Sequence, residues 1–186
     1  MKRARRAIRT GLLGWVTLAS ACLLAAPAVV AKAPSERHLR ATFVYKFTTI
    51  IGWPQQTFDH PVDSFAVCVL GEDPFGGEME KSVAGQKSHN LPVAVHQLED
   101  PAADETCHAV YVAAEDPEEI QRALARYAGS PTLTIGHSED FAKLGGMIEL
   151  RKAERRLRFR INLGAARRAG LEMNSKLLHL AIDVLR

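Results

Sequence analysis

The chain has 186 residues, of which 47% are hydrophobic and 24% charged, and its formal net charge is +3. Five cationic residues among the first nine exceed this surplus, so residues 32–186 carry a formal charge of −2. A mildly acidic body of about 155 residues excludes a general attraction to nucleic acid and suits one domain better than two.

The N-terminus has the layout of an export signal. A basic stretch is followed by an apolar run from Leu12 to Val30, and small residues precede Ala31. This pattern predicts a signal peptide over residues 1–31, cleavage after Ala31 and a periplasmic protein of residues 32–186. One alternative is an uncleaved anchor, because the apolar run approaches the roughly 20 residues that span a bilayer. A lipoprotein at Cys22 fits less well, since the apolar run continues beyond it.

Removing the leader also removes Cys22 and leaves two cysteines, Cys68 and Cys107. An even number of cysteines in an oxidising compartment indicates a disulfide. The two positions are 39 residues apart, and closing such a loop stabilises a folded chain by about 4 kcal/mol. The alternative is two separate buried thiols.

The first half of the body predicts a helix over residues 35–53, ended by Pro54, and a buried strand over residues 64–70. The following Gly-rich segment resembles a phosphate loop, but its acidic residues would repel phosphate. Asp73 as N-cap with Pro74 at the first helical position is the preferred interpretation. Further strands are predicted over residues 91–98, 108–113 and 132–135, with a helix over 117–127 opened by Asp116.

The C-terminal part predicts a short helix from Ser138 to Gly145, a hairpin of residues 147–151 and 157–161 with a turn at 152–155, and a final helix from Asn174 or Ser175 with an apolar stripe reaching Leu185. Together these elements indicate an α/β fold in a single domain. We expect a mixed central sheet of about six strands, helices on both faces, and a C-terminal β-hairpin plus helix.

Catalytic and metal-binding motifs are missing from the sequence. The seven histidines form no HxxxH, HExxH or HxH spacing, and neither a GxSxG nor an SxxK nucleophile motif occurs. We therefore expect no metal, no cofactor and no enzymatic activity. The alternative is an active site assembled from residues that no sequence pattern reveals.

Three arginines alternate along the second hairpin strand and share one face: Arg156, Arg158 and Arg160. A solvated strand face explains most of this cluster. The sharper interpretation is a surface for an anion or an acidic partner, because arginine forms bidentate contacts with carboxylates.

Five segments resemble the YfiR family in order along residues 38–184: ATFVYKFTTIIGWP, FAVCVLGEDPFG, Cys107 before its strand, TLTIGHSEDFAKLGGMIEL and LRFRINLGAARRAGLEMNSKLL. The resemblance implies a dimer-forming α/β repressor in the periplasm. Such a repressor binds the outward-facing domain of a membrane-bound diguanylate cyclase, and its loss raises cyclic di-GMP and favours biofilm. The family depends on disulfides, and Cys68 and Cys107 match one family pair. A second pair found in some relatives has no counterpart here, so any redox response would depend on one bond.

The second functional hypothesis is a periplasmic small-molecule-binding module, accessory to uptake or sensing. Its candidate pocket contains Tyr45, Trp53 and Phe141. Aromatic residues belong to a core more often than to a ligand site, so repression of a cyclase is the preferred hypothesis.

Overall fold

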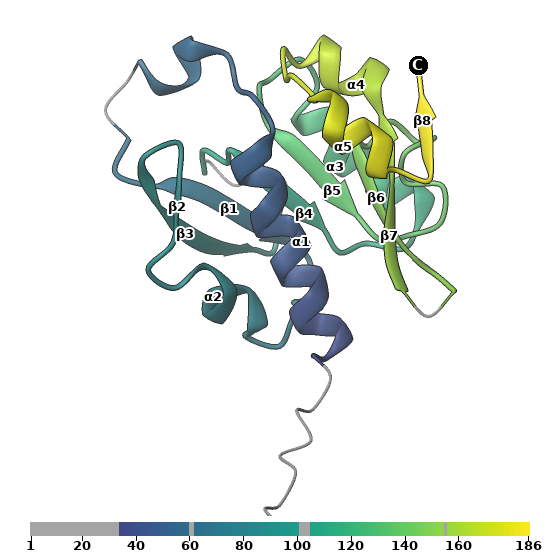
Figure 1. Cartoon of the computed structure of the whole chain (residues 1–186), viewed down its shortest axis with the longest axis horizontal. Coiled ribbons are helices and arrows are strands. Elements are labelled where there is room, and N and C mark those ends of the chain that lie inside the picture. The colour runs from purple at the N-terminus through teal and green to yellow at the C-terminus, as the bar shows by residue number, and fades with distance from the viewer. Residues whose placement is uncertain (1–33, 60–61, 101–104, 155) are drawn as a thin grey trace, which may run out of the picture. The chain divides into compact units, whose positions relative to one another are not determined.

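The structure is a computed structural model, and it describes residues 34–59, 62–100, 105–154 and 156–186 (Figure 1). The predicted leader, residues 1–31, lies outside these ranges, so the cleavage site and the division of the chain at Ala31 stay predictions. In the described ranges, no helix has both the length and the apolar character needed to cross a membrane.

In the part of the chain that the structure describes, an eight-stranded mixed sheet forms the centre of the fold, in the order β2-β3-β1-β4-β5-β6-β7-β8. Its strands are β1 Phe65–Leu70, β2 Lys87–Ser88, β3 Leu91–Leu98, β4 Ala109–Val112, β5 Leu133–Gly136, β6 Ile148–Ala153, β7 Arg156–Asn162 and β8 Asp183–Leu185. The five strands β3, β1, β4, β5 and β6 are parallel, whereas β2 and β7 run antiparallel to β3 and β6. The expected α/β fold is confirmed, but the sheet has eight strands rather than about six because the short edge strands β2 and β8 were not predicted.

Helices cover both faces of this sheet. They are α1 Glu36–Ile50, the 3-10 helix η1 Gln55–Phe58, α2 Glu78–Val83, α3 Pro117–Arg126, α4 Leu163–Arg168 and α5 Ser175–Leu180. One buried cluster, the α1-side core, joins residues of α1, α2, α4 and α5 to Phe65, Tyr111 and Ile161 of the strands. The other, the α3-side core, joins Ile120 of α3 to Cys68 of β1. Figure 1 shows α1 crossing in front of the strands.

Two helix starts follow directly from their capping residues. The Ser35 hydroxyl accepts a hydrogen bond from the His38 amide at 3.1 Å and opens α1. The Asp116 carboxylate accepts from the amides of Glu118 and Glu119, and Pro117 occupies the first turn of α3. These side chains satisfy backbone donors that have no partner inside the helix, as the sequence predicted for α3.

Two predicted helices differ from the structure in the parallel part of the fold. The helix expected from Pro74 begins at Glu78, because Gly76 and Gly77 have positive φ angles of 60° and 79°. The Asp73 carboxylate accepts instead from the amides of Phe75 and Gly77 and stabilises a turn. Residues 139–145, expected as a helix, form successive turns.

The C-terminal helix is also shorter than predicted. It ends at Leu180, and Ala181 is extended with ψ of 143°. The Ile182 amide then donates to the Phe159 carbonyl at 2.9 Å, and β8 pairs in parallel with β7. Pairing with the sheet outweighs the helical spacing of the apolar residues here. Helix α4, capped by Asn162, was not predicted.

Candidate functional site

A disulfide joins Cys68 in β1 to Cys107 just before β4. The two Cα atoms are 5.8 Å apart, which suits a disulfide, and the side chains belong to the α3-side core with 0% and 5% exposure. The bond closes a loop that contains α2, β2, β3 and the crossover from β3 to β4. The pair indicated by cysteine count and compartment is therefore bonded, and its role in regulation stays a prediction.

Backbone and side-chain hydrogen bonds hold the same end of β4. The His108 amide donates to the Ala66 carbonyl, and the Ala66 amide donates back to Nδ1 of His108, both at 3.0 Å. The hydroxyl of Thr132 donates to the Cys107 carbonyl at 2.8 Å. These bonds connect β1, β4 and the start of β5 around the disulfide.

His108 should make stability depend on pH. Its ring stacks on Phe65, and its Nδ1 acts as an acceptor. Burial of the ring is the main cause that lowers its pKa, and the nearby His89 lowers the pKa further. Below about pH 6.5 the unfolded chain then binds a proton that the native state does not, so stability falls as pH decreases through that range. We expect the melting temperature to decline between pH 7.5 and 5.5.

His108→Asn keeps an acceptor but removes the titration, so the decline should become shallower. It should not vanish, because burial also lowers the pKa of His137. Thermal melts of both proteins across this pH range provide the measurement. An unchanged slope in His108→Asn would exclude His108 as its origin.

The predicted arginine surface divides into two parts. Arg160 has a side chain only 14% exposed, and it forms ion pairs with Glu149 at 3.4 Å, Asp183 at 3.1 Å and Asp140 at 3.8 Å. Glu149 is completely buried, lies opposite Arg160 in the sheet register, and accepts a hydrogen bond from the Ala142 amide. Arg160 is thus occupied by an internal ion network.

Arg156 and Arg158 are exposed near the turn of the β6–β7 hairpin. Neighbouring cations are paired: Arg151 with Glu139 and Glu149, and Lys152 with Glu36. Within the described residues, Arg156 and Arg158 form no ion pair, so their guanidinium groups remain available to an acidic partner.

The three aromatic residues suggested for a ligand pocket do not come together. Tyr45 and Trp53 pack in or against the α1-side core, whereas Phe141 lies in the α3-side core. The Tyr45 hydroxyl donates to the Gln86 side chain and the Lys87 carbonyl, and Trp53 packs edge-on against Phe65. This placement gives them no common cavity.

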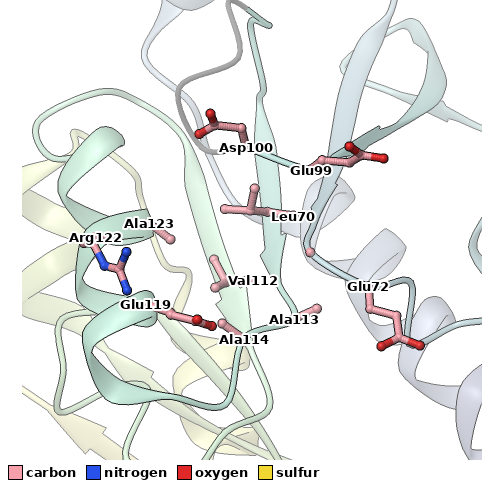
Figure 2. A pocket seen from close by; sticks show the side chains of 11 residues that line it. Leu70, Glu72, Glu99, Asp100, Val112, Ala113, Ala114, Glu119, Arg122 and Ala123 are labelled. Carbon is pink, nitrogen blue, oxygen red and sulfur yellow. The ribbon is translucent and has the colours of Figure 1, made fainter.

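A different pocket opens where the carboxyl ends of β1 and β4 lie side by side (Figure 2). From β1 the chain continues through α2 to β3 on one side, whereas from β4 it continues through α3 to β5 on the other. Strand order reverses between β1 and β4, and in open parallel sheets ligands bind at such a reversal. The pocket has a volume of about 640 Å³.

The pocket combines an apolar floor with a charged rim. Its floor contains Leu70, Val112, Ala113, Ala114 and Ala123, and its rim contains Glu72, Glu99, Asp100, Glu119 and Arg122. Figure 2 shows Glu72 and Glu99 on one side, with Glu119 and Arg122 of α3 on the other. This site was not predicted from the sequence. Acidic residues follow β1, β3 and β4 along the chain, and this was the available signal. Whether these strand ends lie next to one another depends on the strand order, which the sequence does not show directly.

Metal chemistry has no support in the described part of the chain, where no group of three or more histidine, cysteine or acidic side chains is arranged to hold a metal ion. The rim carboxylates surround the pocket without converging on one point. Among the described residues that line the pocket, no nucleophile is paired with a general base.

A family model described as YfiR/HmsC-like matches residues 37–182. The proteins of this YfiR/HmsC-like class are periplasmic regulators of cyclic di-GMP signalling and are not enzymes. The chain belongs to the YfiR/HmsC-like family, because the match covers most of its length.

No curated protein sequence matches the chain. Among solved structures, it is similar to a conserved domain protein from Vibrio cholerae, with 13% identity and a TM-score of 0.47. The alignment covers 64% of this chain and 54% of that one, so the chain spans about half the length of that protein. A similarity at this level assigns no function.

Proposed function

We propose that the protein represses an inner-membrane diguanylate cyclase by binding its periplasmic domain, and that the protein does so as a homodimer. The family match over residues 37–182 carries this proposal. Two features of the chain support it: the disulfide that closes the β1–β4 loop, and the exposed Arg156 and Arg158, which suit an acidic partner.

Deleting the gene should raise cellular cyclic di-GMP and increase biofilm, and restoring it should reverse both effects. Affinity purification of the tagged protein from membranes should recover a protein with a cyclase domain, and light scattering of the purified protein should give the mass of a dimer. Unchanged cyclic di-GMP in the deletion strain would contradict repression.

Replacing Arg156 and Arg158 together with alanine should weaken recovery of the cyclase by roughly tenfold, because two exposed guanidinium groups lose their contacts with carboxylates. The melting temperature should stay within about 2 °C of the parent, since exposed side chains contribute little to stability. Lys46→Ala with Lys176→Ala is the matched control, because it removes two exposed cations from α1 and α5. Equal losses in the two variants would show that net charge, and not this surface, determines binding.

A further inference from the structure

The pocket between β1 and β4 continues into a second hollow, of about 580 Å³, beside the carboxyl end of β3. The two hollows share Gly71, Glu72 and Glu99, and the second adds Asp73, Glu80 and Gln97. We call the combined feature the acidic groove. Among the described side chains that line it, six are carboxylates and one, Arg122, is a cation.

We propose that the acidic groove binds a linear organic polycation, such as a diamine or polyamine, whose ammonium groups contact the carboxylates while its methylene chain lies on the apolar floor. This inference does not depend on repression of a cyclase, because binding can be measured on the isolated protein.

The charge of the groove selects against an anionic ligand. Glu72, Glu99 and Glu119 come from three different segments, the turn after β1, the bend just after β3 and the first part of α3, and they surround one opening. Carboxylates on several sides of a concave surface attract cations and repel phosphates and carboxylates. Arg122 alone does not reverse this balance, and its Nε donates to the Glu118 carbonyl of its own helix.

The spacing of the carboxylates selects against a single metal ion. In the described residues no three potential ligands converge at metal-binding geometry, although both hollows are rich in acidic side chains. A ligand with several charges separated by flexible methylenes can reach carboxylates that one ion cannot bridge. The groove therefore suits an extended cation.

The floor of the pocket explains why the cation should be organic. Leu70 and Val112 end the two central strands, and Ala114 and Ala123 add small side chains that leave the cavity open. Methylene groups placed on this surface are removed from water, which adds a hydrophobic contribution to the ion pairs at the rim.

The proposal is tested by calorimetry on the protein purified from cells that express the full-length gene. The probes are putrescine, spermidine, 1,4-butanediol and Ca²⁺. We expect saturable binding of both amines, tighter for spermidine than for putrescine, and no binding of the uncharged diol. Replacing Glu72 and Glu119 with glutamine should weaken spermidine binding by roughly tenfold, because each exposed ion pair contributes about threefold. Glu154→Gln, in the hairpin turn, is the matched control and should bind as the parent does.

Ala114→Phe tests the cavity without changing charge, because the larger ring fills the floor. We expect it to weaken spermidine binding by at least tenfold. Three results would overturn the proposal: no saturable amine binding, equal affinity in the parent and the glutamine variant, or Ca²⁺ binding that the amines do not match. Undiminished binding by a folded Ala114→Phe protein would show a nonspecific attraction to acidic side chains.

Discussion

Replacing both Cys68 and Cys107 with serine should lower the free energy of unfolding by about 4 kcal/mol and abolish most of the repression. The bond closes a loop over 39 positions, and its removal gives the unfolded chain that loop's conformational freedom. For a domain of this size, the expected loss corresponds to a melting temperature lower by roughly 10 °C. Thermal melts with and without dithiothreitol measure it.

Two controls separate the bond from its surroundings. Cys68→Ala with Cys107→Ala removes the bond without placing hydroxyls in the α3-side core, so it isolates the cost of the open loop. Val110→Ala lies in the same cluster, is completely buried and keeps the disulfide. It should melt lower than the parent and still lose stability on reduction, whereas the cysteine variants should not respond to the reductant.

The functional consequence follows from linkage between folding and binding. A loss of about 4 kcal/mol changes the ratio of folded to unfolded protein by nearly three orders of magnitude. In the proposed mechanism the folded protein is the form that binds the cyclase, so reduction should lower the population of the binding state. A cysteine variant that represses and melts like the parent would exclude a redox role for this pair.

The strands and helix α3 of the parallel part of the fold could be predicted because their signals are local. The run from Leu91 to Leu98 is strand β3 without any shift of boundary, and Asp116 caps α3 as its sequence context indicates. The two hairpin strands also occur within one or two residues of their predicted ends. In these segments, capping, periodicity and packing favour the same structure.

The C-terminal region could not be predicted from local signals. The apolar residues from Leu177 to Leu185 have helical spacing, but the chain leaves the helix at Ala181 because β7 still offers an open edge for β8. The pairing of β8 with β7, about 20 residues earlier in the chain, depends on the tertiary structure, and the spacing of apolar residues carries no information about it.

The candidate sites show the same division. Cysteine count and compartment were sufficient to indicate the pair Cys68–Cys107, whereas the acidic groove depends on which strand ends are adjacent. Alternation correctly placed Arg156, Arg158 and Arg160 on one face. Alternation could not show that Glu149 of β6 lies opposite Arg160 of β7. Nor could it show that the Ala142 amide, from the turns before β6, donates a hydrogen bond to the Glu149 carboxylate.

Arg160 is paired with buried and partly buried carboxylates, whereas Arg156 and Arg158 are exposed, so their replacement should affect stability very differently. Arg160→Ala should lower the free energy of unfolding by about 3 kcal/mol, because it leaves the buried Glu149 carboxylate without its main cationic partner. The same change should loosen β8, since Arg160 also pairs with Asp183 of that strand. By comparison, Arg156→Ala and Arg158→Ala should each change stability by less than about 0.5 kcal/mol. Urea denaturation of the three variants provides the measurement.

A double-mutant cycle distinguishes loss of the ion pair from loss of packing by the arginine stem. If the pair is the cause, Glu149→Ala should be less damaging in the Arg160→Ala background than in the parent, because the double variant buries no unpaired charge, and the coupling should be at least about 1 kcal/mol. Arg151 also lies 3.5 Å from Glu149 and tempers the effect, so Arg151→Ala should make Arg160→Ala more costly. Strictly additive losses for Glu149 and Arg160 would mean that the network contributes through packing, in which case Arg160 would again be a candidate for the partner surface.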